Sequence, residues 1–205
     1  MKIFTVFNHN FAKYYRLLKR SCNRLNYTLD YKLLNESLND YYYLQLEDGW
    51  KSKALHKAKY LLQYMEELPD GELVIYLDVD TLLLDKIDEV NTKDYDIGLT
   101  YRIKEDFINL KNGHEKYMEI GNCGVLFLYK NEQIMHLLKT WGENIYIYKN
   151  DQLALKATLD RKTIKTKDFD PIVYNFAYFK HLDYRSAKIL HFKTSSRQYY
   201  KNFIL

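Results

Sequence analysis

The sequence predicts a single α/β domain with a central, mostly parallel sheet flanked by helices on both faces. Strand-like and helix-like segments alternate along the chain, as is typical of parallel sheets with helical crossovers. One uninterrupted apolar run, Leu73–Leu77, is typical of a central strand buried on both faces. The 205 residues contain only 7 Gly and 2 Pro, which gives no sign of a linker, so residues 1–205 are treated as one domain.

Six segments have the composition of strands. Lys2–Asn8 alternates and is rich in β-branched and aromatic residues, which predicts a buried first strand. Leu73–Leu77 is the central strand, and Gly121–Tyr129 begins as a turn that leads into another buried strand. The remaining candidates are Asn26–Lys32, Tyr95–Tyr101 and Lys188–Phe192.

Four segments show helical spacing of their apolar residues. The clearest is Lys51–Glu67, where apolar residues recur at i, i+3, i+4 and i+7. The turn sequence Pro69-Asp70-Gly71 follows it and predicts its end. The other predicted helices are Phe11–Leu25, Glu132–Trp141 and Asp151–Leu159.

Charge and cysteine content narrow the class of protein. The net charge is +4, from 31 basic and 27 acidic residues, a balance that does not predict nucleic-acid binding. Cys22 and Cys123 form neither a disulfide framework nor a zinc motif, which favours a reducing compartment. The apolar start Met1–Val6 is too short for a signal peptide, and no apolar run reaches the ~18 residues that span a bilayer. We therefore expect a soluble cytoplasmic protein; its oligomeric state is left open.

Two carboxylates follow the central strand, in Asp78-Val79-Asp80. Ligands of open α/β sheets bind beyond the carboxyl ends of strands. Side chains at i and i+2 of an extended chain project to one side, where two acids repel each other unless a cation lies between them. Oxygen ligands suit Mg²⁺ or Mn²⁺, so the sequence predicts a divalent-metal site; the alternative is a pair of acids that cap the next segment.

The segment Asp78-Val79-Asp80-Thr81 after LVIYL resembles the D-x-D motif of GT-A-fold glycosyltransferases, especially the glycogenin-like and galactosyltransferase-like families. Four further segments resemble family motifs in the same order. Gly49–Lys53, which is expected to open a helix, resembles the W-x-x-K stretch, and Asn122–Val125 resembles the N-[ST]-G-[VM] turn. Asp151-Gln152 resembles the D-Q pair, and Ile189–Phe192 resembles the I-[LV]-H-[FY] strand. The matches extend over nearly the whole chain. The resemblance implies a GT-A-like (Rossmann-like) domain.

The resemblance also implies a ligand set for the metal. Asp80 is the principal ligand, Asp78 contacts the metal and the ribose of the donor, and His191 completes the protein's share of the coordination sphere. An imidazole beside two carboxylates is compatible with Mn²⁺. The alternative for His191 is a buried histidine that bonds to the backbone.

The resemblance places the nucleotide at the end of the first strand, near Phe7 and Asn8, with Tyr14 as an aromatic residue that can stack on the base. Tyr14 also fits the core face of a helix. Lys53 is a candidate partner of the diphosphate or of a motif aspartate, or else a solvated lysine at a helix start. Lys193 and Arg197 follow the late histidine, where the family keeps a cation for the pyrophosphate. The family's H-x-x-G-x-K-P-W pattern is incomplete here, so which of the two residues binds phosphate stays open. The alternative is that both belong to an exposed basic tail and bind no phosphate.

Asn122, Asp151 and Gln152 are the candidate catalytic residues on the acceptor side. In retaining members a polar residue near the D-Q pair faces the donor and stabilises the developing oxocarbenium ion; in an inverting enzyme an acid there acts as general base. Asp151 alternatively caps the helix that it begins. Asn175, in VYNF, is a further residue within reach of the site.

The expected activity is metal-dependent transfer of a hexose from a nucleoside-diphosphate sugar, UDP-hexose by resemblance, to a hydroxyl of a glycan, a glycosylated protein or another acceptor, with retention. A phosphatase of the haloacid dehalogenase type, with Asp78 as nucleophile, requires D-x-D-x-[TV] near the N-terminus, whereas Leu82 occupies the last position here. A nucleotidyltransferase requires a glycine-rich loop after the first strand, and residues 7–11 contain no glycine. A catalytically silent nucleotide-sugar or glycan-binding module is the non-enzymatic alternative.

Overall fold

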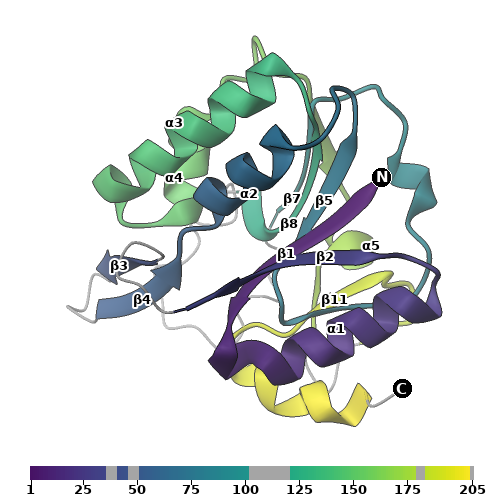
Figure 1. Cartoon of the computed structure of the whole chain (residues 1–205). Coiled ribbons are helices and arrows are strands. Elements are labelled where there is room, and N and C mark those ends of the chain that lie inside the picture. The colour runs from purple at the N-terminus through teal and green to yellow at the C-terminus, as the bar shows by residue number, and fades with distance from the viewer. Residues whose placement is uncertain (36–40, 46–50, 102–120, 179–182, 204–205) are drawn as a thin grey trace.

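The computed structural model describes residues 1–35, 41–45, 51–101, 121–178 and 183–203, of which 41–45, 51–55, 194–195 and 201 are described by their backbone alone. A six-stranded sheet forms its centre, in the order β2-β1-β5-β8-β7-β9 (Figure 1). In that order the strands are Leu29–Leu34, Lys2–Asn8, Leu73–Leu77, Gly121–Tyr129, Ile97–Tyr101 and Thr166–Phe169.

The direction of these strands confirms the predicted, mostly parallel sheet. β1 pairs in parallel with β2 and β5, and β7 pairs in parallel with β9. Only β8 is reversed within this sheet, because it pairs antiparallel with both β5 and β7. The carboxyl ends of β1 and β5 therefore lie beside the amino-terminal half of β8.

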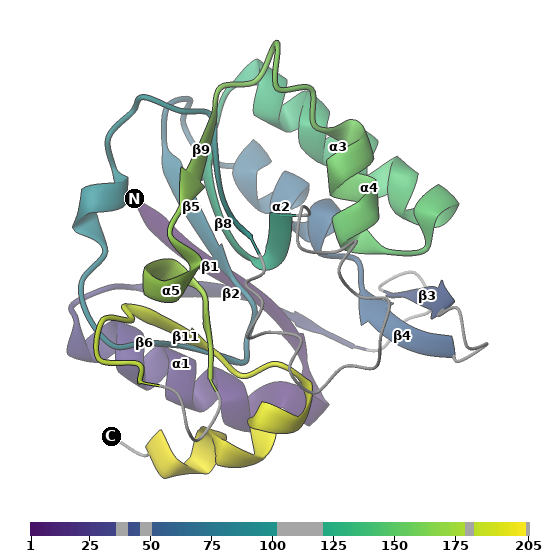
Figure 2. The ribbon, with the colours of Figure 1, turned by 180° about the vertical axis from the view of Figure 1, so that it is seen from behind.

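Helices cover both faces of the sheet, as predicted. Along β5, Val74 and Tyr76 face one core, while Leu73, Ile75 and Leu77 face the other. The first core contains buried residues of α2 (Lys57–Glu66), α3 (Glu132–Tyr148) and α4 (Asp151–Thr158). The second contains residues of α1 (Ala12–Arg24), on the opposite side (Figures 1 and 2).

A smaller sheet, in the order β10-β11-β6, lies on the same side as α1. Its strands are Phe176–Ala177, Ile189–His191 and Thr81–Leu83. Short helical segments complete the described chain: η1 (His9–Phe11), η3 (Asp88–Val90), α5 (Pro171–Tyr174) and η6 (Thr194–Phe203). A third core joins η6 to α1 and the small sheet through Tyr14, Phe192 and Tyr200.

The prediction of one helix over Lys51–Glu67 is wrong in its first third. Lys51–Leu55 is strand β4, which pairs antiparallel with β3 (Tyr41–Gln45), and the helix begins at Lys57. Ala54 and Leu55 fit the helical spacing by coincidence, and pairing with a distant segment overrides that local pattern. The second strand also begins at Leu29, three residues later than predicted.

Candidate functional site

Asp78 and Asp80 lie in a tight turn that joins the two sheets. The backbone amide of Asp78 extends the β5–β8 ladder by donating to the carbonyl of Gly124 at 2.7 Å. The carbonyl of Asp78 then accepts from the amide of Thr81 at 3.0 Å and from its Oγ1 at 2.8 Å. The two carboxylates thus share a space because the chain turns there, not because it stays extended as the sequence argument assumed.

His191 reaches the same space through strand pairing. β11 runs antiparallel to β6, with His191 opposite Thr81, and the amide of Phe192 donates to the carbonyl of Asp80 at 2.9 Å. The His191 Nε2 atom lies 3.4 Å from Asp80 Oδ1 and 3.8 Å from Asp78 Oδ2. The three residues place one ligand atom each within 4.8 Å of one another.

A buried amide orients the imidazole of His191. Asn175 donates through Nδ2 to Thr100 Oγ1 at 2.7 Å, which turns its Oδ1 toward His191 Nδ1 at 2.9 Å. An amide oxygen only accepts, so Nδ1 of the ring carries a hydrogen, and Nε2, which faces the carboxylates, can bind a cation in place of a hydrogen of its own. This is the arrangement by which proteins orient histidine ligands of metals.

Replacing Asn175 with leucine is expected to weaken Mn²⁺ binding about 10- to 100-fold, the usual cost of losing a residue that orients a ligand. It also leaves Nδ1 of His191 and Oγ1 of Thr100 without their partner, which costs about 1–3 kcal/mol of stability for each buried group. Calorimetric titration with Mn²⁺ and thermal melts measure the two effects. Asn175→Asp keeps an acceptor for Nδ1 and is the matched control; equal losses in both variants would contradict the orienting role.

The Lys57 ammonium is a buried cation between two carboxylates. Its Nζ lies 3.0 Å from Asp78 Oδ1 and 3.1 Å from Asp151 Oδ2, and it donates to the carbonyl of Cys123 at 3.2 Å. Burial favours the neutral amine, but the carboxylates of Asp78 and Asp151 outweigh it and raise the pKa of Lys57 well above its ordinary value. Tyr76 also donates to Asp78 Oδ1, at 2.8 Å.

Arg197 forms a hydrogen bond with Oδ2 of Asp80. Its Nε donates to Asp80 Oδ2 at 2.6 Å from a side chain that is 43 % exposed, whereas the carboxylate is 4 % exposed. Burial raises the pKa of Asp80, but hydrogen bonds and charges from His191 and Arg197 outweigh it and lower the pKa to about 2. The guanidinium also lies 5.4 Å from the ring centre of Phe11.

These contacts leave a donor set that fits a divalent cation. Arg197 bonds to Oδ2 of Asp80, and Lys57 donates to both oxygens of Asp78, at 3.0 Å to Oδ1 and 3.3 Å to Oδ2. Asp80 Oδ1 and Asp78 Oδ2 are the oxygens that face Nε2 of His191. Two carboxylate oxygens and one imidazole nitrogen suit Mn²⁺ or Mg²⁺. With Asp151 included, three carboxylates against two cations leave one net negative charge, which favours a further cation.

Gly124 provides the space in which this cluster packs. A Cβ atom at this position would lie 2.2 Å from His191 Cε1 and 2.9 Å from both Asn122 Oδ1 and Asp78 Oδ2. These distances are shorter than van der Waals contact, so even one methyl group must displace a proposed ligand. Glycine in the Asn122–Val125 motif is therefore required by the close approach of side chains.

Gly124→Ala is expected to reduce stability by about 1–3 kcal/mol, as overpacking does in cores, and to weaken Mn²⁺ binding because His191 must move. Gly121→Ala, on the same strand, is the matched control, since its Cβ would meet Leu99 at 3.4 Å and beyond. Thermal melts and Mn²⁺ titrations of the two variants test this. Wild-type metal affinity in Gly124→Ala would show that His191 is not a ligand.

The candidate catalytic residues lie beside this cluster. Asp151 is the first residue of α4, whose N-cap is Asn150, and it bonds to Lys57. Asn122 is buried and accepts from the amide of Gly124 at 2.8 Å. Gln152 Oε1 is buried and, within the described part of the chain, has no hydrogen-bond partner. A buried acceptor without a partner is unusual, which makes Gln152 a residue to test.

The other candidate binding residues each have different neighbours. Phe7 is buried and stacks on Tyr15, and Asn8 caps η1 by accepting from the amide of Asn10. Tyr14 is 8 % exposed in the third core. The amide of Lys193 donates to the carbonyl of His191 at 3.2 Å. Lys53 lies in β4, not at a helix start, and its side chain, like all of Trp50, is outside the described residues.

Sequence reasoning missed Lys57. It lies four residues after Lys53, on the same face of the helix that was predicted to include both. The start of α2 at Lys57 is what distinguishes Lys57 from Lys53 as the partner of a motif aspartate, because Lys53 lies in β4. A lysine at a predominantly apolar helix face was the available signal, since ammonium groups are seldom buried without a partner.

Comparison with solved structures defines the class of this fold: it is the GT-A-type fold of glycosyltransferases. A glycosyltransferase involved in the glycosylation of the major capsid of PBCV-1 superposes with a TM-score of 0.64 at 17 % identity, over 98 % of each chain. Galactosyltransferase LgtC, in complex with donor and acceptor sugar analogs, superposes with a TM-score of 0.55 at 16 % identity, over 95 % of this chain and 88 % of LgtC.

GlyE of Streptococcus pneumoniae, also a glycosyltransferase, superposes with a TM-score of 0.59 at 15 % identity, over 95 % of this chain and 55 % of GlyE. No family model matches the sequence, and no curated protein matches it. In the described residues, no helix combines the length and apolar character needed to cross a membrane.

Proposed function

We propose that this protein is a metal-dependent glycosyltransferase that moves a hexose from a nucleoside-diphosphate sugar, UDP-hexose in our proposal, to an acceptor hydroxyl. The observation that carries the proposal is the convergence of Asp78 Oδ2, Asp80 Oδ1 and His191 Nε2 beyond the end of β5. These three atoms would hold the ion. When bound, a divalent cation supplies Lewis-acid neutralisation of the charge on a departing nucleoside diphosphate.

The donor is proposed to lie over the carboxyl ends of β1 and β5, where ligands of such sheets bind. Arg197 is our proposed cation for the diphosphate, because its exposed side chain already bonds to Asp80, a proposed metal ligand. Phe11 offers an aromatic face beside Arg197 for the base, whereas Phe7 is 3 % exposed.

Gln152 and Asp151 are proposed to face the reacting sugar. In transfer with retention, the bond from C1 to the phosphate oxygen breaks, the bond from C1 to the acceptor oxygen forms, and the hydroxyl proton leaves with the diphosphate. The unpartnered Gln152 Oε1 is suited to stabilise positive charge on the sugar ring. A glutamine-to-glutamate active-site mutant of LgtC provides an independent reason to consider this residue.

The rival functions are less consistent with these contacts. In a haloacid-dehalogenase-type phosphatase Asp78 must attack phosphorus, but Lys57 and Tyr76 already occupy its Oδ1. A silent binding module has no need for a donor set that matches a metal. The acceptor is proposed to be a hydroxyl of a glycan or a glycosylated protein, by analogy with the neighbours' class.

Thermal-shift screening of nucleotide-sugars, with and without Mn²⁺, tests the proposal. A ligand that binds only the native state raises the free energy of unfolding, by about 2.7 kcal/mol when its concentration is about 100 times its Kd. The melting temperature rises as a result. We expect the largest shift from a UDP-sugar together with Mn²⁺, and slow release of UDP from that sugar. No shift with any nucleotide-sugar, or equal shifts with and without metal, would contradict the proposed function.

A further inference from the structure

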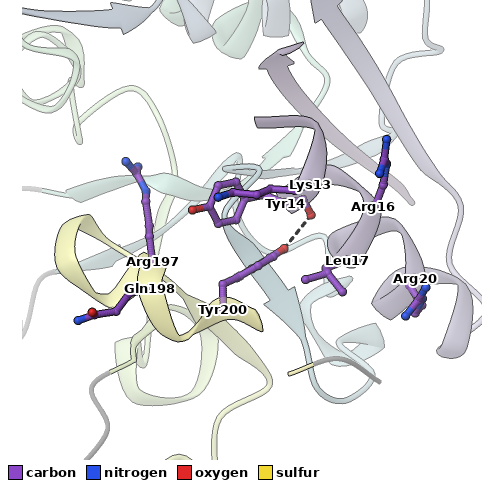
Figure 3. Close-up of a pocket in the computed structure, with 8 residues that line it drawn as sticks. All are labelled: Lys13, Tyr14, Arg16, Leu17, Arg20, Arg197, Gln198 and Tyr200. Atoms are coloured by element: carbon purple, nitrogen blue, oxygen red, sulfur yellow. Dashed lines mark hydrogen bonds between the residues drawn. The ribbon is translucent and has the colours of Figure 1, made fainter. Parts of the chain in front are cut away.

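A pocket of about 580 Å³ lies between α1 and η6 (Figure 3). None of its lining residues is one of the proposed metal ligands. Its volume is within the range of about 300–1,000 Å³ that small-molecule sites occupy. α1 contributes five lining residues and η6 three: Lys13, Tyr14, Arg16, Leu17, Arg20, Arg197, Gln198 and Tyr200. A hydrogen bond from the Tyr200 hydroxyl to the carbonyl of Tyr14, at 2.7 Å, joins the two elements.

The charge of this pocket has one sign. Four of its eight lining residues are cationic, and none is acidic. α1 as a whole (AKYYRLLKRSCNR) carries five basic residues and no acidic one. Lys13, Arg16 and Arg20 follow one another at i, i+3 and i+7, so they form a row about 10 Å long on one side of the helix. A row of this kind, on a molecule whose net charge is only +4, concentrates positive charge at the pocket and so favours an anionic ligand there.

The rest of the lining is apolar and aromatic. Leu17 and the rings of Tyr14 and Tyr200 belong to the third core and form the surface between the cations. Guanidinium groups match phosphate oxygens in bidentate geometry, which favours phosphate over a single carboxylate. An aromatic or aliphatic group attached to that phosphate would cover the apolar part of the lining.

We infer that this pocket binds a phosphate or diphosphate group attached to an apolar moiety, at a site separate from the metal centre. The pocket contains none of the proposed metal ligands. It meets the metal centre only through Arg197, which lines the pocket and bonds to Asp80. Arg197 is also the proposed contact of the donor diphosphate, so the test uses Arg16 and Arg20, which have no role in the proposed transferase activity.

Titration with phenyl phosphate in buffer that contains EDTA and no nucleotide tests the inference. We expect phenyl phosphate to bind more tightly than inorganic phosphate, because its ring contacts Leu17 and the tyrosines. The double variant Arg16→Gln/Arg20→Gln should weaken binding at least about tenfold, equivalent to about 1.4 kcal/mol. Both arginines are exposed, so the fold should survive, as thermal melts will check.

Lys139→Gln is the matched control, since it removes one exposed charge from α3, on the other side of the sheet from α1 (Figure 1). It should bind phenyl phosphate as the wild type does. Equal binding by the wild type and the arginine double variant would overturn the inference, whatever the outcome of the nucleotide-sugar screen.

Cosedimentation with phosphatidylglycerol vesicles identifies the source of the phosphate. If the wild type sediments with the vesicles and the arginine double variant does not, the phosphate belongs to a lipid headgroup. If neither sediments while phenyl phosphate still binds, the ligand is a soluble phosphate ester. Both results support the same pocket, because in both cases the arginine double variant must bind phenyl phosphate more weakly than the wild type does.

Discussion

Asp80→Asn is expected to abolish Mn²⁺ binding, with an affinity loss of at least about 100-fold, and with it all metal-stimulated release of nucleoside diphosphate. The substitution keeps the size of the side chain but removes the charge from a group that is 2 % exposed. A neutral amide cannot offset a divalent cation, and its nitrogen cannot serve as a ligand in place of Oδ1. Calorimetric titration with Mn²⁺ measures the loss directly.

Asp94→Asn is the matched control for this variant. Asp94 is an exposed aspartate that also pairs with a cation, Lys167, at 2.8 Å. The control should bind Mn²⁺ with the affinity of the wild type. If Asp80→Asn retained metal-stimulated turnover, the assignment of Asp80 as a ligand would be wrong.

The pKa of Asp80 sets the pH range in which its charge contributes to stability. Its pKa in the folded protein is about 2, below the ordinary value of 3.8. A lowered pKa means that the contribution is fully present above about pH 4 and is lost as the pH falls toward 2. Experiments on the metal at neutral pH therefore always meet a charged carboxylate.

The second large effect is expected from Lys57→Met, which should destabilise the protein by about 3–5 kcal/mol in the presence of EDTA. The substitution removes the cation from between Asp78 and Asp151 and leaves two neighbouring carboxylates without their partner. Added Mn²⁺ should recover part of the loss, because the ion supplies positive charge beside Asp78. Chemical denaturation with and without Mn²⁺ measures both quantities.

Lys59→Met is the matched control, since it removes the same charge two residues along α2, where Lys59 lies over the ring of Tyr60. Its effect should be below about 1 kcal/mol, because Lys59 is half-buried, whereas Lys57 is buried. Lys57→Arg should keep most of the stability, because the charge remains. Equal destabilisation by Lys57→Met and Lys59→Met would contradict the bridging role of Lys57.

The sequence predicted the central strand, the residues that follow it and the late strand with His191, because each of these depends on local pattern. It also supplied the order of the motifs. It did not reveal that β8 is reversed, or that His191 lies opposite Thr81, since both are properties of pairing between distant segments. The proximity of Asp78, Asp80 and His191 was nevertheless predicted, through the resemblance to a family with the same motifs; that they bind a metal stays a prediction.

One wrong prediction with consequences for the site, and one choice that the sequence left open, both depend on contacts between distant segments. β4 pairs with β3 and so shortens the helix predicted over Lys51–Glu67, which shifts the lysine of interest from Lys53 to Lys57. The choice between Lys193 and Arg197 could not be made from their order in the chain. Packing of η6 against α1 brings Arg197 to Asp80, and local propensity contains no information about that contact.

Lys57 and Arg197 predict how the protein behaves when the proposed metal is removed. Each offsets the charge of a carboxylate without any metal, so we expect the chain to stay folded in the metal-free state. Chelation should empty the centre without unfolding the domain, and returning the ion should restore the holo form at once. In this respect the protein should fold first and bind the metal afterwards, unlike small zinc domains that fold only around their metal.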